Sequence, residues 1–222
     1  LLLSEIAPTW IGIDRNKSFK LASENGADCI VMDDGFQNPT LQKDFSIVVI
    51  NGEQGFGNKR VIPSGPLRES INRGLSRTNL VITIGDISEA VKNKIPKHIP
   101  LITANFKIKE DDMMLKGQSV TAFAGIAYPE KFFNSLKLVK ANIVDKISYS
   151  DHHIYSEDDL LYLAEIANKN KSILVTTKKD MVRIPKNFRS LVKTIDGFIE
   201  LDDEKLLLEI LSNLIENKIN QL

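Results

Sequence analysis

Residues 27–38 of the chain read ADCIVMDDGFQN, and this stretch decides the fold class. The apolar run Cys29–Met32 is too short for a helix and ends abruptly at two aspartates and a glycine, which predicts an interior strand of an open α/β sheet. Ligands of such sheets bind outside the carboxyl ends of the strands. Asp33 and Asp34 are therefore candidate metal ligands. The alternative is a turn in which the two aspartates only cap backbone amides.

Apolar strands alternate with helical segments along the chain, which predicts an α/β fold of mostly parallel sheets with flanking helices. The expected strands are Thr9–Ile13, Ile47–Ile50, Leu80–Ile84, Ser119–Phe123, Ile143–Tyr149 and Ile173–Val175. Four helices are expected. The first, Lys17–Glu24, is ended by Asn25 and Gly26, and the second begins near Pro129 and turns Phe132, Phe133, Leu136 and Leu138 toward the core. The third is capped by Ser156 and Asp159, and the fourth is an amphipathic helix over residues 202–222. The charged residues 107–118 predict a linker or hairpin between a first domain, residues 1–106, and a second, smaller α/β domain, residues 119–222.

Composition limits the function classes. The 222 residues are 42% hydrophobic, which allows a sizeable core, and 29 basic side chains balance 29 acidic ones, so no nucleic-acid partner is expected. The single cysteine, Cys29, is expected to be a buried, inert thiol in a reducing compartment. No apolar run approaches the roughly 20 residues of a membrane span, so any membrane contact of this segment is expected to be peripheral.

A second segment rich in glycine and proline, residues 55–69, reads GFGNKRVIPSGPLRE and follows the expected strand Ile47–Ile50. Prolines restrict a loop and glycines permit tight turns, so the segment is suited to a defined conformation. Arg68 could bind a phosphate with two hydrogen bonds, while Glu69 could orient a metal-bound water or a lysine. The alternative is a surface turn with an exposed ion pair of little energetic value.

Two short motifs lie at strand ends in the second half. Adjacent histidines on an extended segment point in opposite directions, so His152 and His153 would be poor joint ligands of one metal. One histidine facing a carboxylate could instead help to activate a hydroxyl, although a histidine that only hydrogen-bonds within its loop is the simpler reading. The motif at residues 176–180, TTKKD, could attract phosphate, but it reads better as the start of a short helix.

Taken in order, the motifs resemble those of the tetraacyldisaccharide 4′-kinase family, the lipid A 4′-kinases of Gram-negative bacteria. The resemblance covers most of the chain, to about residue 183, and rests on DDGFQ at 33–37, GFGN at 55–58, PSGPLRE at 63–69, GIA at 125–127, DHH at 151–153 and VTTKKD at 175–180. It implies a P-loop-kinase-like core that transfers the γ-phosphate of ATP to the 4′-hydroxyl of a tetraacyldisaccharide 1-phosphate. The expected location is the cytoplasmic face of the inner membrane.

The resemblance also implies roles for single residues. Asp33 and Asp34 would bind Mg²⁺, with Asp34 counted among the catalytic residues, and Glu69 would hold a metal-bound water. Gln37 and Asn38 would lie near the ATP phosphates, although the family commonly has histidine where this chain has Asn38. Arg68 would stabilise the transferring charge. His152, closing in from the second domain, would assist a catalytic aspartate that the family carries upstream of the matched segment.

One motif of P-loop kinases is missing. The pattern G-x-x-x-x-G-K-[ST] occurs nowhere in the sequence, since residues 52–59 have glycines at the wrong spacing and no Ser or Thr after the lysine. We therefore expect the C-terminal portion of a longer kinase, inactive alone, whose membrane contact comes mainly from the missing part. The alternatives are a non-catalytic remnant or regulatory fragment of that fold, or an unrelated α/β hydrolase that uses the two aspartates with a metal.

Overall fold

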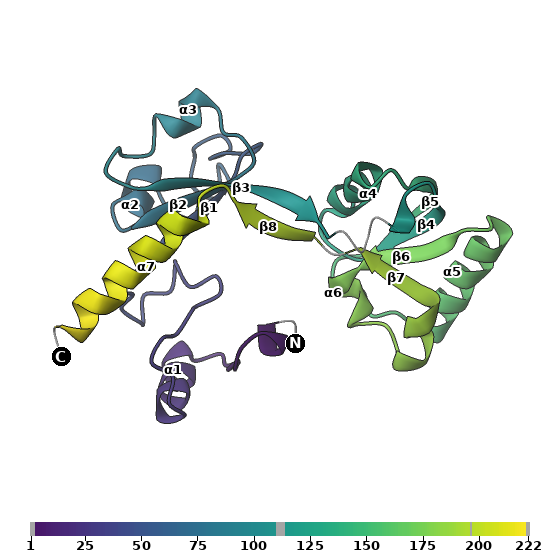
Figure 1. Cartoon of the computed structure of the whole chain (residues 1–222), viewed down its shortest axis with the longest axis horizontal. Coiled ribbons are helices and arrows are strands. Elements are labelled where there is room, and N and C mark those ends of the chain that lie inside the picture. The colour runs from purple at the N-terminus through teal and green to yellow at the C-terminus, as the bar shows by residue number, and fades with distance from the viewer. Residues whose placement is uncertain (1–2, 110–113, 196, 221–222) are drawn as a thin grey trace. The chain divides into compact units, whose positions relative to one another are not determined.

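A computed structural model describes residues 3–109, 114–195 and 197–220 (Figure 1). The chain divides into two compact units. The first unit comprises Pro8–Phe106 and Ile199–Leu222, and the second comprises Lys107–Phe198 and Leu1–Ala7. The last helix therefore groups with the first half of the chain, whereas the sequence analysis placed residues 119–222 together.

The first unit is built on a sheet in the order β1-β2-β3-β8, of which β1, β2 and β3 run parallel. Its strands are β1 (Ile47–Asn51), β2 (Leu80–Ile84), β3 (Leu101–Ile108) and β8 (Gly197–Leu201). Its helices are α1 (Arg15–Glu24), α2 (Ile71–Leu75), α3 (Glu89–Lys92) and α7 (Glu204–Ile219). Apolar side chains of β1 and β2 meet those of the helices and loops in one core that includes Ile50, Leu75, Val81 and Val91.

Two strands predicted for this unit are absent. Thr9–Ile13 and Cys29–Met32 have no regular secondary structure, and Cys29 is exposed, not buried. Val31 is 90% exposed, and no strand among the described residues pairs with this segment. An apolar run forms a strand only where a partner satisfies its backbone.

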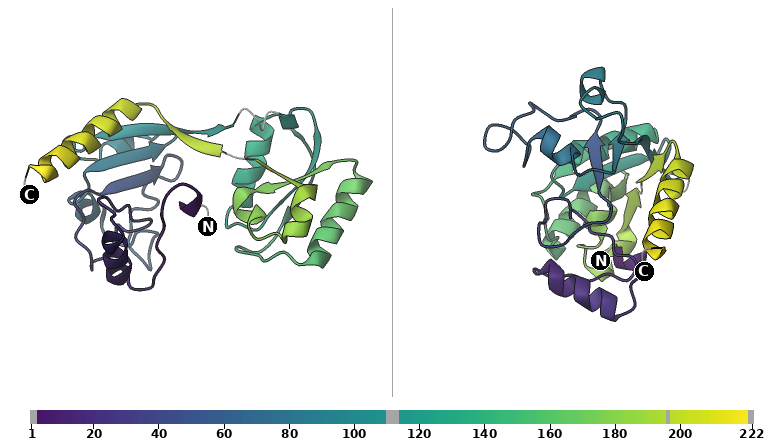
Figure 2. Two further views of the ribbon diagram at one scale, coloured as in Figure 1. Left: turned by 60° about the horizontal axis from the view of Figure 1, so that its bottom comes forward. Right: turned by 90° about the vertical axis from the view of Figure 1, so that its left-hand side faces the viewer.

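The second unit, which Figure 2 shows in teal and green, holds a parallel sheet in the order β5-β4-β6-β7, with its strands labelled in Figure 1. Its strands are β4 (Ser119–Ala124), β5 (Asn142–Ser148), β6 (Ile173–Thr177) and β7 (Val192–Ile195). Its helices are α4 (Pro129–Leu138), α5 (Glu157–Lys169), α6 (Lys178–Met181) and two 3-10 turns, η1 (Leu3–Glu5) and η3 (Lys186–Leu191). The prediction of a mostly parallel α/β fold is confirmed.

Local signals in this unit were read correctly. Pro129 begins α4, whose residues Phe132, Phe133 and Leu136 are buried as predicted, whereas Leu138 is exposed, contrary to the prediction. Alpha-helix α5 begins with the expected capping box. The short helix α6 confirms that the TTKKD motif begins a helix. Part of the expected linker at residues 107–118 lies outside the described residues. No helix in the described part of the chain is long and apolar enough to cross a membrane.

Candidate functional site

The loop between β1 and α2 delivers Glu69 to a defined place. Gly65 is required there, because a Cβ at this position would lie 2.3 Å from the carbonyl oxygen of Arg60. Ser70 then caps α2 by accepting a hydrogen bond from the backbone N–H of Arg73. The side chain of Glu69, just ahead of this cap, is only 14% exposed. Glu69 is therefore a largely buried carboxylate, whereas the exposed ion pair of this loop joins Arg68 to Asp34.

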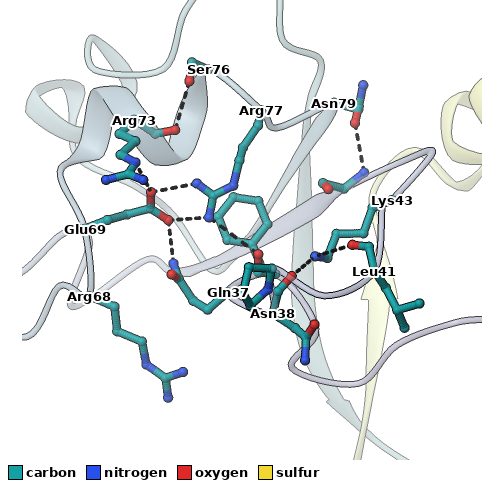
Figure 3. Close-up of a pocket in the computed structure, with 13 residues that line it drawn as sticks. Gln37, Asn38, Leu41, Lys43, Arg68, Glu69, Arg73, Ser76, Arg77 and Asn79 are labelled. Carbon is teal, nitrogen blue, oxygen red and sulfur yellow. Dashed lines mark hydrogen bonds and ion pairs between the residues drawn. The ribbon is translucent and has the colours of Figure 1, made fainter. Parts of the chain in front are cut away.

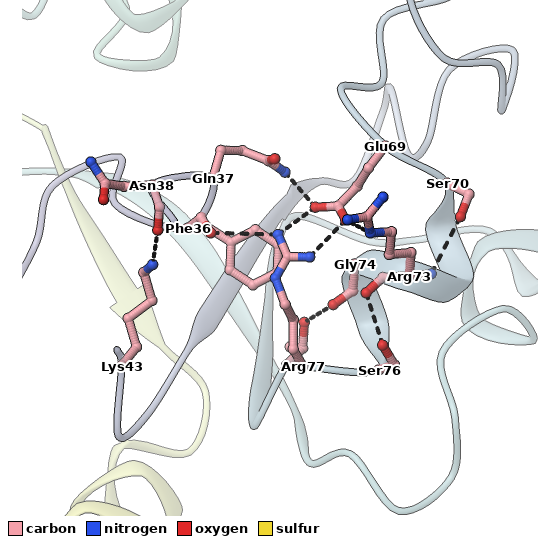
Figure 4. A network of polar contacts seen from close by, with 11 residues as sticks. Phe36, Gln37, Asn38, Lys43, Glu69, Ser70, Arg73, Gly74, Ser76 and Arg77 are labelled. Carbon is pink, nitrogen blue, oxygen red and sulfur yellow. Dashed lines mark hydrogen bonds and ion pairs between the residues drawn. The ribbon is translucent and has the colours of Figure 1, made fainter. Parts of the chain in front are cut away.

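Glu69 joins two motifs that lie about thirty residues apart in the sequence (Figure 4). Gln37 donates from Nε2 to Glu69 Oε1 at 2.5 Å, across a separation of 32 residues. Arg77 donates to both carboxylate oxygens, at 2.6 Å from Nη1 and 2.5 Å from Nη2, and Arg73 approaches within 3.7 Å. The Glu69 carboxylate thus ties the DDGFQ segment to the PSGPLRE segment.

Electrostatics favour the ionised form of Glu69. The hydrogen bonds from Arg77 lower the pKa of the Glu69 carboxyl, against the opposing effect of partial burial, and the bond from Gln37 adds to the lowering. The same contacts raise the pKa of Arg77. Both groups remain charged over the physiological pH range, so the pair is a permanent feature of the site.

Arg77 also fixes the aromatic ring of the DDGFQ motif. Its guanidinium carbon lies 4.2 Å from the centroid of the Phe36 ring, and its Nη2 donates to the Phe36 carbonyl oxygen at 3.5 Å. Next to it, Asn38 accepts hydrogen bonds through Oδ1 from the backbone N–H and hydroxyl of Thr40, while Lys43 donates to its carbonyl oxygen. Asn38 therefore closes a turn, and asparagine is common in turns because its side chain can hydrogen-bond to the backbone two residues further on.

Arg68 points away from this cluster (Figure 3). It lies 3.9 Å from Asp34, and the two side chains are 61% and 77% exposed, so the pair itself contributes little to stability. Asp33 is exposed as well, and Asp34 has a φ of 49°, which places the two carboxylates on a tight turn and not at the end of a strand. Two exposed carboxylates and one exposed guanidinium are available to a ligand at this point.

A cavity of about 620 Å³ lies beside the cluster, and its lining includes Phe36, Gln37, Asn38, Arg68, Glu69 and Arg77 (Figure 3). Asp33 and Asp34 are not part of this lining. Within residues 3–109, 114–195 and 197–220, no three His, Cys, Asp or Glu side chains are grouped closely enough to hold a metal ion. Asp33, Asp34 and Glu69 do not form such a group, and their joint metal role stays a prediction.

The two histidines belong to the second unit and differ sharply. His152 has a φ of 60° and a side chain that is 86% exposed, with Asp151 at 3.8 Å. His153 Nε2 instead lies 3.1 Å from Asp159 Oδ2, and its ring stacks on Tyr149 with 4.5 Å between centroids. His153 is thus a structural side chain, whereas His152 is free to meet a ligand. The histidine that faces a carboxylate inside the second unit is therefore His153, and the catalytic role of His152 stays a prediction.

Two groups next to His153 have shifted pKa values, for opposite reasons. Burial, followed by the charge of Asp159, raises the pKa of Tyr149 to about 12. Burial acts to raise the pKa of Asp159, but the hydrogen bonds from Ser156 and His153 outweigh it, so the pKa of Asp159 is lowered. The capping carboxylate therefore stays ionised and keeps both its helix-capping role and its hold on His153.

Sequence reasoning missed Arg77, which makes more contacts to the site than any predicted arginine there. A pair between Glu69 and Arg73 can be predicted from the sequence, because Arg73 lies one helical turn after Glu69. Arg77 offers no such signal, because it lies beyond the end of α2. Helix α2 ends at Leu75, and the contact of the Arg77 guanidinium with the carboxylate is made from the residues after it.

Comparisons with known proteins agree with these motifs. A family model described as tetraacyldisaccharide-1-P 4′-kinase (LpxK) matches residues 1–216. A tetraacyldisaccharide 4′-kinase of Gluconobacter oxydans is 43% identical over 195 residues, which cover 88% of this chain and 60% of that protein. One from Rhodospirillum rubrum is 43% identical over 215 residues, or 95% of this chain and 65% of the relative.

A solved structure shares the fold. The crystal structure of an "apo" form LpxK from Aquifex aeolicus in complex with ATP superposes with a TM-score of 0.68 over 90% of this chain and 62% of that one, at 22% identity. This chain thus spans less than two thirds of the length of the two named relatives and of the solved structure.

Proposed function

The chain belongs to the tetraacyldisaccharide-1-P 4′-kinase family, and from that membership we propose that it is part of an enzyme that transfers the γ-phosphate of ATP to the 4′-hydroxyl of a tetraacyldisaccharide 1-phosphate. The observation that carries this proposal is the junction of DDGFQ and PSGPLRE through Glu69, Gln37 and Arg77. Phosphoryl transfer depends mainly on positioning and charge neutralisation. The contacts of Glu69 with Gln37 and Arg77 bring charged groups next to the turn that carries the DDGFQ motif.

Arg68 is the phosphate-binding group of the proposal. Its guanidinium is exposed, and the partner found for it among the described residues is Asp34 at the long distance of 3.9 Å, so it can reach a ligand without losing a strong partner. A guanidinium can donate two parallel hydrogen bonds to a phosphate, and its charge persists at any pH of interest. Arg68 would stabilise negative charge on the transferred group.

Asp33 and Asp34 fit a magnesium ion by the chemistry of their donors. Mg²⁺ is commonly bound through one or two carboxylates, together with water and substrate phosphates, and both carboxylates are exposed on the turn. When bound, the ion would neutralise charge on the phosphates. Glu69 is less suited to this task, because its oxygens already accept hydrogen bonds from Arg77 and Gln37; we assign it the orientation of Gln37 instead.

His152 is the proposed acid–base assistant. Its exposed imidazole is the histidine of the Asp-His motif that is not engaged with Asp159. A neutral imidazole can share a proton with a carboxylate or hydroxyl near neutral pH. We further propose peripheral association with the cytoplasmic face of the inner membrane, because a substrate with four acyl chains resides in a membrane.

The test begins with the native protein. Its intact mass and N-terminal sequence, measured from the membrane and soluble fractions, define the form to assay. That form should transfer radiolabelled phosphate from ATP to tetraacyldisaccharide 1-phosphate, and an Arg68→Ala variant should lose most of the transfer. A native form that neither binds Mg-ATP nor transfers phosphate would overturn the proposal in favour of a non-catalytic remnant.

A further inference from the structure

The backbone at His152 adopts a conformation that side chains with a Cβ rarely use. Its φ of 60° lies in the left-handed region, which is uncommon for residues other than glycine. Such a residue persists only where its surroundings hold it, and it often marks a functional turn. The imidazole itself is 86% exposed and cannot supply that restraint. The restraint must therefore come from contacts of the neighbouring backbone.

Gly125, at the end of β4, provides the first contact. Its carbonyl oxygen accepts the backbone N–H of His152 at 3.0 Å. A Cβ at Gly125 would lie 3.0 Å from the Cβ of His153 and 3.2 Å from the Ser150 carbonyl oxygen, so the strand end and the turn are closely packed. The position of His152 is thus tied to the peptide groups of Gly125.

Asp180, which has no exposed surface, holds the other side of Gly125. Its Oδ1 accepts the backbone N–H of Gly125 at 3.0 Å and the hydroxyl of Tyr155 at 2.9 Å, and its Oδ2 accepts the hydroxyl of Thr177 at 2.6 Å. Burial and the nearby Asp180 carboxylate raise the pKa of Tyr155, so its hydroxyl remains a donor. A buried carboxylate with several donors is a rigid anchor.

Arg183 connects this anchor to both sides of His152. Its Nη2 lies 3.4 Å from Asp180 Oδ1, and its side chain is 18% exposed. Its Nη1 donates to the Gly125 carbonyl oxygen at 3.0 Å and to the His153 carbonyl oxygen at 3.3 Å. The guanidinium therefore bridges two carbonyls: that of Gly125, which also accepts the N–H of His152, and that of His153, which follows His152 in the chain.

We propose that Asp180 and Arg183 are positioning residues that hold the strained turn of His152 and so aim its imidazole. The proposal rests on the proposed function, in which His152 serves the phosphoryl transfer. It assigns to the TTKKD motif and the arginine after it a structural task at the strand ends, not a phosphate-binding one. Asp180 and Arg183 contact backbone groups of the turn and need not touch a substrate.

The test uses Arg183→Lys, which keeps the charge beside Asp180 but loses the planar fork that reaches two carbonyls. The matched control is Arg189→Lys, because Arg189 also donates to two backbone carbonyls of the second unit, those of Ile184 and Val182, but to none in the turn. Circular dichroism melts show whether each variant folds. Arg183→Gln, which retains amide donors, replaces Arg183→Lys if the latter does not fold.

The first readout is kinetic, in the native form of the enzyme. Arg183→Lys should lower kcat about tenfold to a hundredfold, as misplacement of a catalytic group does, with the KM for ATP nearly unchanged. In a His152→Ala background the same substitution should cause no further loss, because the group that it positions is gone. Arg189→Lys should behave like the wild type. Additive losses, or an unchanged kcat in Arg183→Lys, would overturn the proposal.

The second readout needs no activity. Amide hydrogen exchange in this chain should become faster at His152 in Arg183→Lys, whereas Tyr149, whose N–H is bonded to Ala124 in the sheet, should stay protected. Unchanged exchange at His152 would contradict the positioning role. If the wild-type enzyme shows no transfer, or His152→Ala retains full turnover, the proposed function fails, and the exchange measurement still decides whether Arg183 holds the turn.

Discussion

The structural roles of several side chains in this molecule differ from those that their residue types suggest. Glu69 reads as a metal ligand, yet its contacts make it the link between two distant motifs. His152 and His153 are adjacent and chemically identical, but one is exposed and the other is stacked and bonded to Asp159. Partners, more than residue types, decide these roles.

Replacing Glu69 by Gln tests the link. The change removes the charge that Arg77 pairs with, so the free energy of unfolding should fall by about 1–2 kcal/mol, the usual cost of depriving a partly buried group of its partner. Chemical denaturation measures the loss. Glu53→Gln, at an exposed position of the same loop, is the control and should change stability little.

The same carboxylate predicts a pH dependence. The folded-state pKa of Glu69 is lowered, so its stabilising contribution is fully present above its unfolded-state pKa of about 4.3 and is lost as the pH falls through the lower folded-state value. The difference in stability between wild type and Glu69→Gln should therefore shrink on acidification. A difference that stayed constant down to the acid transition would contradict this assignment.

Two buried threonines offer a paired test of hydrogen bonding. Among the described residues, Thr83 Oγ1 has no hydrogen-bond partner, whereas the hydroxyl of Thr176 donates to the Phe123 carbonyl oxygen at 2.7 Å; both residues are fully buried. Thr83→Val should leave this chain as stable or up to about 1 kcal/mol more stable, while Thr176→Val should cost about 1 kcal/mol. Equal destabilisation by both changes would show that Thr83 has a partner after all.

Among the elements, those with complete local signals match the predictions best. Helix α1 begins after Asp14, whose carboxylate accepts the N–H groups of Asn16 and Lys17, and ends at Asn25 ahead of Gly26 with a φ of 83°. Helix α5 has a full capping box. Such signals act within one turn of the chain, so they need no tertiary partner.

The capping box of α5 can be tested directly. Ser156→Ala should cost about 1 kcal/mol of stability, because the side chain accepts the N–H of Asp159 and also donates to the Asp159 carboxylate. Ser88→Ala is the matched control, since Ser88 occupies the N-cap of α3 without a side-chain capping bond. Thermal unfolding of both variants measures the difference, and equal losses would argue against the capping interpretation.

At the scale of the whole molecule, the site residues fall into both units. The DDGFQ and PSGPLRE motifs belong to the first unit, and the DHH motif belongs to the second. The charged residues 107–118 predict a single boundary between two domains, whereas the chain changes units at Lys107 and returns to the first unit at Ile199. That return through β8 and α7 has no signal in the local pattern.

Activity of the complete enzyme should depend on Asp34. Asp34→Asn should reduce phosphoryl transfer by about a hundredfold or more, as expected for loss of a charged group that acts in the transition state, with little change in the melting temperature because the side chain is 77% exposed. Asp28→Asn, another exposed aspartate of the same loop, is the control. Full turnover in Asp34→Asn would remove Asp34 from the proposed site.

The sequence by itself determined the α/β class, strands β1, β2, β4, β5 and β6, the C-terminal stop of α1, the capping box of α5 and the candidate residues, because periodicity and capping act over a few neighbouring residues. Only the tertiary structure decided that Cys29–Met32 is not a strand, that Arg77 holds Glu69, and that Asp180 and Arg183 hold the turn of His152. These outcomes depend on partners distant in sequence, since a strand forms only beside another strand and an ion pair only where the fold brings two charges together.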